Sequence, residues 1–169
     1  QLLEKLARGD TERVKFTLVE GRNFRQLLAE LKALPNLNDD ISGKTAEAIM
    51  LQLGRPGVHP EGRFLPDTYF LNKGDAMSAI LQQSMVAMDS ALASAWTERD
   101  TAIPLKSAEE LLIMASIVEK ETGIAEERAQ IAGVFMRRLQ KGMRLETDPT
   151  VIYGIGEAYD GDIRKKDLQ

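Results

Sequence analysis

Two glutamates that follow a long apolar run are the residues best placed to do chemistry. The segment ASIVEKETG, residues 115–123, carries Glu119 and Glu121 at the end of a stretch that would be apolar nearly all round as a helix. A helical side chain leans back over the preceding turn, so Glu119 would cover two small residues, Ala115 and Ser116. Space for a substrate would remain beside its carboxylate, and the apolar neighbours would disfavour its charged form. A general acid requires such an environment.

Glu119 and Glu121 do not form a catalytic pair. Because they are two residues apart on one helix, their side chains are separated by about 200° around the helix axis. One of them is expected to face a cleft, and the other to be solvated or to form a structural ion pair. The ordinary interpretation of both is a solvated or salt-bridged residue where a buried helix ends. The residues alone leave this interpretation and catalysis open.

A second catalytic carboxylate is not evident. A glycoside hydrolase normally uses two, and the candidates for the second are Glu61, Asp67 and Asp148. Each lies beside proline or glycine, where an acidic residue usually caps a helix or closes a turn. His59 is the only histidine and there is no cysteine, so a histidine-based triad, a thiol nucleophile and a multi-histidine metal site are disfavoured. No phosphate-binding glycine motif occurs. We therefore expect no cofactor and no metal.

The elements that must position these residues are mainly helical. Asn23, Asp75 and Ser107 are the expected helix caps. Helices are predicted over residues 2–8, 23–34, 45–53, 76–97, 108–122 and 125–141, with a short one beginning at Asp148-Pro149. Strands are predicted over residues 13–19 and 67–71. The sequence thus predicts an α+β fold that is mainly α.

Composition narrows the class of protein. The 169 residues carry a net charge of −4 with both signs mixed along the chain, which argues against a nucleic-acid partner. No run is long and apolar enough to span a bilayer, and no signal peptide opens the chain. Because the sequence starts as if inside a helix and stops without a terminal signal, we expect a fragment of a longer protein whose anchor or export signal lies outside it.

Three segments together resemble the endolytic murein transglycosylase family, also called MltG or YceG-like. They are PEGRFLPDTYF (60–70), LLIMASIVEKET (111–122) and RLETDPTVIYGIG (144–156). IAGVFMRRL (131–139) also fits, although the family more often has Asn at the position of Arg137. The resemblance covers nearly the whole chain, and ASIVEKE combined with TDPTVIYG is its most specific part.

The resemblance implies a lyase that acts on peptidoglycan. Such an enzyme is held in the bacterial inner membrane by a single span, with its catalytic part outside the cytoplasm. It cuts nascent glycan strands internally at the MurNAc-GlcNAc bond and leaves a 1,6-anhydro-MurNAc end. The family's catalytic glutamate falls on Glu119, which would serve as acid and then as base, without a second carboxylate. A peptidoglycan synthase is the protein partner that the family implies.

The resemblance also gives roles to other motif residues. Substrate contacts are expected from Ser116, Glu61, Tyr69, Thr147, Asp148, Thr150 and Tyr153. Glu121 is expected to have a supporting role, and maintenance of the fold is the alternative for each of these residues. The implied organisation is the end of a LysM-like subdomain and a connecting strand over residues 1–20. A lysozyme-like, C-terminally truncated catalytic domain over 21–169 follows, with a small α/β portion at its N-terminal side.

Two other functions stay open. The first is a lysozyme-type hydrolase in which Asp148 helps to activate water. The second is a non-catalytic, glycan-binding scaffold of the wall-synthesis machinery. In the leading interpretation Glu119 lies in a cleft between the 108–122 helix and the two motif loops.

Overall fold

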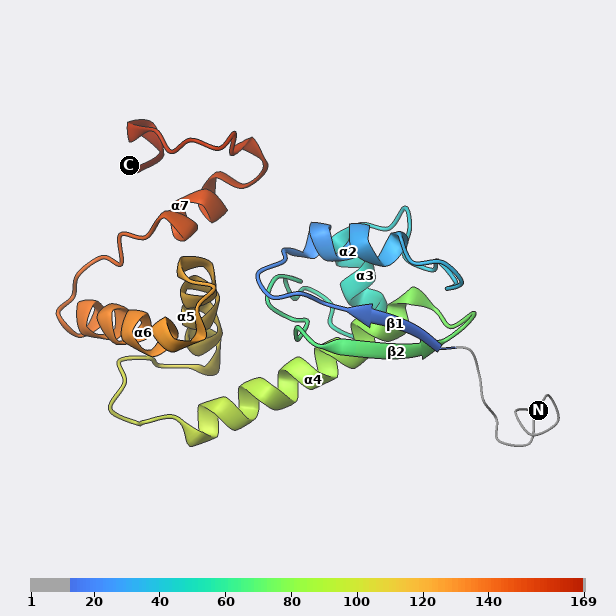
Figure 1. Ribbon diagram of the computed structural model, residues 1–169, viewed down its shortest axis with the longest axis horizontal. Helices are drawn as coiled ribbons and strands as arrows, with labels where there is room; N and C mark the ends of the chain where they lie inside the picture. The colour runs from blue at the N-terminus through green and yellow to red at the C-terminus, as the bar shows by residue number, and fades with distance from the viewer. Residues whose placement is uncertain (1–12, 169) are drawn as a thin grey trace. The chain divides into compact units, whose positions relative to one another are not determined.

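The computed structural model describes residues 13–168, which divide into two compact units (Figure 1). Unit 1 ends at Leu92 and unit 2 begins at Ala93. The helix predicted over residues 2–8 lies outside the described residues. The expected subdomain boundary at residues 20/21 stays a prediction. The mainly α fold with a small α/β portion at its N-terminal side is confirmed.

A two-stranded sheet and three helices make up unit 1. Strand β1 (Arg13–Thr17) pairs antiparallel with β2 (Thr68–Asn72), and Phe16 lies opposite Tyr69. Helices α2 (Phe24–Lys32) and α3 (Ala46–Gln52) lie between the strands in sequence, and α4 (Met77–Glu98) follows β2. The buried side chains that form the core are Phe16, Leu18, Phe24, Leu27, Leu31, Ile41, Ile49, Met50, Leu53, Phe64, Tyr69, Leu71, Met77, Ile80, Leu81 and Met85.

Local capping explains where α2 begins. The Asn23 side chain accepts a hydrogen bond from the Gln26 amide, and the Gln26 side chain accepts one from the Asn23 amide. This reciprocal capping box satisfies two amides that the helix leaves without partners. The predicted cap at Asn23 is therefore confirmed, and the first residue of α2, Phe24, stacks on Phe64 with 5.4 Å between ring centroids.

The predicted cap of α4 is wrong, because the helix start is held from a distant loop. Asp40 accepts hydrogen bonds from the Ser78 amide at 3.0 Å and from the Ser78 hydroxyl at 2.5 Å. The carboxylate of Asp75 instead accepts from the Asn72 amide at 2.8 Å and closes the turn after β2. Partial burial works to raise the pKa of Asp40, but the hydrogen bonds from Ser78 and Gln52 outweigh it and lower that pKa.

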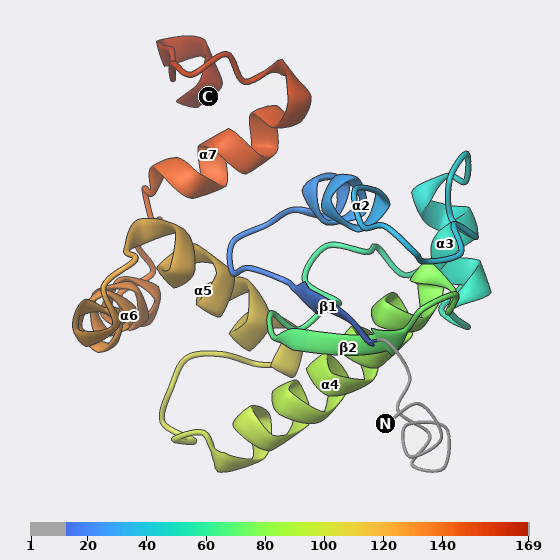
Figure 2. The same ribbon diagram turned by 45° about the vertical axis from the view of Figure 1, so that its right-hand side comes forward.

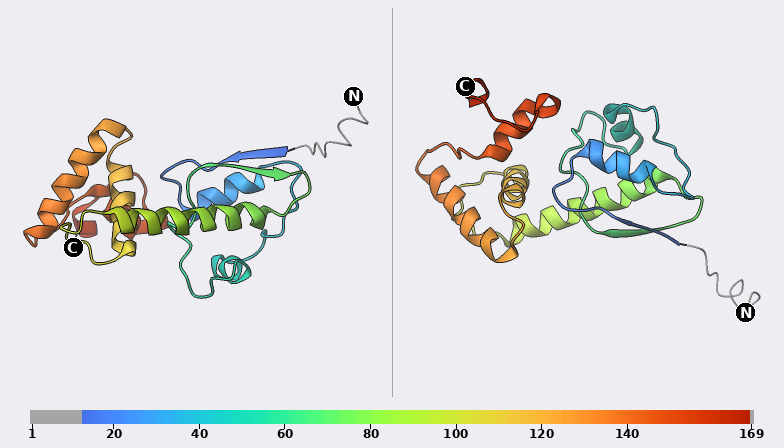
Figure 3. Two further views of the ribbon diagram at one scale, coloured as in Figure 1. Left: turned by 90° about the horizontal axis from the view of Figure 1, so that it is seen from below. Right: turned by 45° about the horizontal axis from the view of Figure 1, so that its top comes forward.

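Helix α4 is one continuous helix whose end lies in unit 2 (Figure 3). Its buried positions are Met77, Ile80, Leu81, Ser84, Met85 and Met88, which recur at helical spacing. Within residues 13–168, no helix has both the length and the apolar character that crossing a membrane requires.

Unit 2 contains α5 (Ala108–Glu121), α6 (Ala125–Gln140) and α7 (Asp148–Ile155) (Figure 2). Ser107 caps α5 by accepting from the Glu110 amide at 3.2 Å, as predicted. Glu126 and Glu127 occupy the first turn of α6 and two arginines its last turn, which suits the helix dipole. The small core of unit 2 comes from α5, α6 and the loop before α5, and consists of Leu105, Met114, Ile117, Val118 and Phe135.

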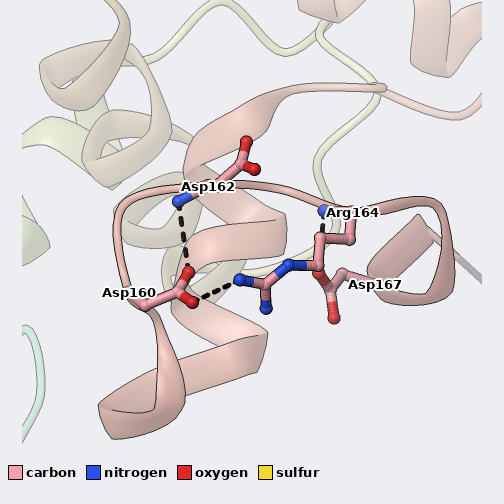
Figure 4. Close-up of polar contacts among 4 residues, drawn as sticks. All are labelled: Asp160, Asp162, Arg164 and Asp167. Carbon is pink, nitrogen blue, oxygen red and sulfur yellow. Dashed lines mark hydrogen bonds and ion pairs between the residues drawn. The ribbon is translucent and has the colours of Figure 1, made fainter.

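Two 3-10 turns complete unit 2, η1 (Gly156–Ala158) and η2 (Lys165–Leu168), and η2 contacts α7. The segment between them is closed by polar contacts of its own (Figure 4). The Arg164 guanidinium pairs with Asp160, and the Arg164 amide donates to the Asp167 carboxylate at 2.8 Å. These contacts fold the chain back after η1.

Candidate active site

Glu119 lies where the buried face of α5 reaches the surface. The two residues before it, Ile117 and Val118, are each 7% exposed, whereas Ala115 and Ser116 one turn earlier are exposed. The Glu119 side chain itself is 27% exposed. The carboxylate therefore lies at the edge of the core beside small, solvent-accessible residues.

The carboxylate of Glu119 is paired with a cation from the next helix. Arg128 Nη2 lies 3.1 Å from Glu119 Oε2, and the arginine side chain is 44% exposed. The sequence patterns did not single out Arg128. A signal was present, because a cation in the first turns of a helix opposes the helix dipole. Glu119 in the last turn of α5 opposes its own helix dipole in the same way.

The stability that this pair adds does not explain its presence. A charge placed against a helix dipole costs about 0.3–1 kcal/mol. An exposed ion pair contributes about 0–1 kcal/mol. The pair therefore only offsets the unfavourable placement of its two members.

A short turn fixes how α6 leaves α5. The hydroxyl of Thr122, which is 8% exposed, donates to Glu127 at 2.8 Å and accepts from the Ile124 amide at 3.0 Å. The Thr122 amide also donates to the Val118 carbonyl at 3.2 Å, which closes the last turn of α5. Arg128 follows Glu127 directly, so this network sets the first turn of α6 where Arg128 meets Glu119.

Glu121 makes a different contact from Glu119, as their positions on the helix predict. The Thr147 hydroxyl donates a hydrogen bond to Oε1 of Glu121. Thr147 is 5% exposed and stands at the N-cap of α7, yet its side chain makes no capping bond to that helix. The contact connects the end of α5 to the start of α7 and brings the two most specific motifs together.

Other predicted site residues of unit 2 are placed around this connection. The Ser116 hydroxyl donates to the Ile113 carbonyl at 2.7 Å within α5. The Thr150 hydroxyl donates to the Thr147 carbonyl at 2.8 Å within the first turn of α7. Asp148 is exposed at the start of α7, and Tyr153 is 65% exposed on the same helix. Asp148 and Tyr153 are thus open to solvent, whereas both hydroxyls bind backbone carbonyls.

Glu61 and Tyr69 belong to unit 1, where both side chains bind the protein itself. The two carboxylate oxygens of Glu61 accept from the Phe24 amide at 3.0 and 3.1 Å. The Tyr69 hydroxyl donates to the Leu65 carbonyl at 2.6 Å, and the residue is 8% exposed. Burial, with the nearby charge of Asp67, raises the pKa of Tyr69 to about 12. Their predicted contacts with substrate stay predictions.

No group of three or more histidine, cysteine, aspartate or glutamate residues in the described part of the chain is arranged to hold a metal ion. The polar contact that the structure gives Glu119 is the ion pair with Arg128.

Comparisons with known proteins identify the family. The sequence model of the YceG-like family matches residues 1–169, so the chain belongs to that family. This confirms the resemblance drawn from the three motifs.

Two relatives carry the name endolytic murein transglycosylase. One, from Bacillus subtilis (strain 168), is 35% identical over 112 residues, which cover 66% of this chain and 31% of that protein. Another, from Streptococcus pneumoniae serotype 2, is 33% identical over 99 residues, which cover 57% of this chain and 17% of that protein. The chain thus spans less than a third of either relative.

A solved structure supports the fold. The crystal structure of a YceG-like protein from Listeria monocytogenes matches 100% of this chain and 61% of its own, with a TM-score of 0.62 and 25% sequence identity.

Proposed function

We propose that this chain carries the catalytic glutamate of a peptidoglycan lytic transglycosylase, and that Glu119 is its single acid/base residue. One observation carries the proposal: a glutamate at the end of a core helix is partly exposed beside small, accessible residues. The names of the relatives from Bacillus subtilis and Streptococcus pneumoniae supply the substrate class. A hydrolase with two carboxylates would need Asp148, exposed in the first turn of α7, to activate water.

In the proposed reaction Glu119 acts twice. Its protonated carboxyl first gives a proton to the glycosidic oxygen between MurNAc and GlcNAc, and the bond from that oxygen to the muramic anomeric carbon breaks. The 6-hydroxyl of the same muramic residue then bonds to the anomeric carbon, and its proton returns to Glu119. The products are a strand with a 1,6-anhydro-MurNAc end and a strand with a free 4-hydroxyl on GlcNAc. Because the attacking hydroxyl belongs to the substrate, its effective concentration is high and water is not consumed.

The surrounding residues divide into positioning and contact roles. Thr147 is buried and bonded to Glu121, which favours a role in holding α7 in place over a direct contact with sugar. Tyr153 and Asp148 are exposed on α7, so we assign contacts with glycan to them. An aromatic ring such as that of Tyr153 offers an apolar face to a sugar ring and a polar hydroxyl at its edge.

The remaining parts of the proposal concern the whole protein. We propose that the full-length protein is anchored in the inner membrane, acts outside the cytoplasm on nascent glycan strands, and works beside a peptidoglycan synthase. The resemblance of the sequence motifs to the family supports these features, and the contacts of Glu119 support only the catalytic part.

The reaction class is tested by digesting purified glycan strands with the full-length protein and analysing the new ends by mass spectrometry. Anhydro-ended internal fragments are the expected product. Reducing ends would replace the transglycosylase with a hydrolase. Unchanged strands, under conditions where the protein binds them, would favour a glycan-binding scaffold.

A further inference from the structure

The mechanism above leaves one partner of Glu119 without a role. Arg128 Nη2 contacts Oε2 of the Glu119 carboxylate, and among the described residues Arg128 is its one polar partner. The second oxygen, Oε1, is left for another ligand. We propose that Arg128 is a positioning residue that fixes which oxygen of Glu119 carries the catalytic proton. This inference rests on the function proposed above.

The donor chemistry of arginine gives the reason. A guanidinium carries only N–H donors and cannot accept a hydrogen bond. While Arg128 contacts Oε2, a proton on Oε2 would point at a donor, so the proton of Glu119 must lie on Oε1. Oε1 is then the atom that gives its proton to the glycosidic oxygen and later receives the proton of the muramic 6-hydroxyl. Arg128 itself neither gains nor loses a proton in this cycle.

Polar contacts of Thr122 hold the turn that brings Glu119 and Arg128 close together. Thr122 and Glu127 hold the turn between α5 and α6, and Arg128 follows them in the first turns of α6. Glu119 and Arg128 therefore approach each other from two helix ends that a buried hydroxyl joins. Orientation of the carboxylate follows from the fold and does not require bound substrate.

The same contact accounts for the unfavourable placement of both charges. Glu119 lies near the C-terminal end of α5 and Arg128 near the N-terminal end of α6, each against its own helix dipole. This placement orients one oxygen of the Glu119 carboxylate, which a general acid/base needs. An ion pair that served only the stability of the fold would not need two charges placed against their helix dipoles.

The test compares variants of the full-length protein on purified glycan strands, with anhydro ends counted to obtain kcat and KM. Arg128→Ala is expected to lower kcat by about 10- to 100-fold with little change in KM, because the carboxyl is no longer oriented. Arg128→Lys should recover most of kcat, since an ammonium is also a pure donor. Guanidinium ion, added at millimolar concentration to Arg128→Ala, should restore part of kcat.

A matched control is Arg55→Ala. Arg55 also forms one ion pair, with Asp89 in unit 1, and these side chains are 48% and 49% exposed. This variant should keep kcat and KM unchanged. An unfolding curve for each protein shows whether the variant is folded. Only a folded variant that has lost the orientation of Glu119 should regain kcat when guanidinium ion is added.

Each outcome decides the proposal. A wild-type kcat in Arg128→Ala would overturn it and leave Arg128 as a surface ion pair. A fall in kcat that neither lysine nor guanidinium recovers would also overturn it, in favour of a structural role. Glu119→Gln, measured in parallel, distinguishes the two proposals: if that variant remains active, the proposed function itself fails, whatever Arg128 does.

Discussion

The Thr147 hydroxyl donates a hydrogen bond to the Glu121 carboxylate and so connects the last turn of α5 to the first turn of α7. Glu121 is exposed and Thr147 is 5% exposed, so the contact lies at the boundary between the unit 2 interior and solvent. It joins the two most specific sequence motifs through the side chains of Glu121 and Thr147.

Thr147→Val is therefore expected to loosen α7. The substitution keeps the side-chain shape but removes the hydrogen bond to a charged group, at a cost of about 1–2 kcal/mol in the free energy of unfolding. Amide hydrogen exchange in residues 148–155 should speed up, which mass spectrometry detects. Thr97→Val is the control, because the Thr97 hydroxyl donates to a carbonyl of its own helix. Unchanged exchange over residues 148–155 would contradict the connection.

Glu61 is expected to act mainly on the fold of unit 1. Its carboxylate accepts the Phe24 amide at the start of α2, so Glu61→Ala should lower the free energy of unfolding by about 1 kcal/mol. Glu61→Gln keeps a carbonyl acceptor and should be nearly as stable as the wild type. Denaturant unfolding and KM for glycan strands are measured together. A raised KM in Glu61→Gln at normal stability would instead establish Glu61 as a contact for sugar.

Tyr69 should make the protein sensitive to alkali. Burial raises the pKa of Tyr69 from 10.0 to about 12, so below pH 10 the phenol is neutral in both the folded and the unfolded chain. Between pH 10 and 12 only the unfolded chain ionises, and the free energy of unfolding should fall as pH rises. Tyr69→Phe should remove this fall while losing the bond to the Leu65 carbonyl. The same alkaline slope in both proteins would contradict the assignment.

Asp40 should stabilise α4, whereas Asp75 should not. The pKa of Asp40 is lower in the folded protein than its ordinary value of 3.8. Its contribution to the free energy of unfolding is therefore complete above pH 3.8 and is lost as pH falls through the pKa of Asp40 in the folded protein. Asp40→Ala should cost about 1 kcal/mol near neutral pH, as lost caps do. Denaturant unfolding followed by far-ultraviolet circular dichroism measures this change in the free energy of unfolding. A larger cost for Asp75→Ala than for Asp40→Ala would reverse the assignment of the cap.

Features set by neighbouring residues could be predicted from the sequence. The caps at Asn23 and Ser107 and the helical spacing of the apolar residues of α4 depend on positions within two turns of each other. The placement of Glu119 at the edge of the core follows from the same kind of pattern, because side-chain direction on a helix is fixed by geometry.

Contacts between distant residues could not be predicted in this way. Asp40 reaches Ser78 over 38 positions, and Glu61 reaches Phe24 over 37. The local signal at Asp75 favoured a helix cap, which is wrong. The signal at Glu61 favoured a cap or a turn, but it did not show that the partner is the Phe24 amide. Arg128 is only nine positions from Glu119, yet the turn that joins them depends on the buried hydroxyl of Thr122.

The most direct test of the central claim compares two glutamates of one helix. Glu119→Gln and Glu121→Gln remove the same charge from α5 and keep the side-chain size. In the full-length protein, Glu119→Gln should lower the release of anhydro-ended fragments from glycan strands by at least about 100-fold, because a general acid/base is lost. Glu121→Gln should retain most of the activity. Equal activity of Glu119→Gln and the wild type would mean that Glu119 only marks where a buried helix reaches the surface.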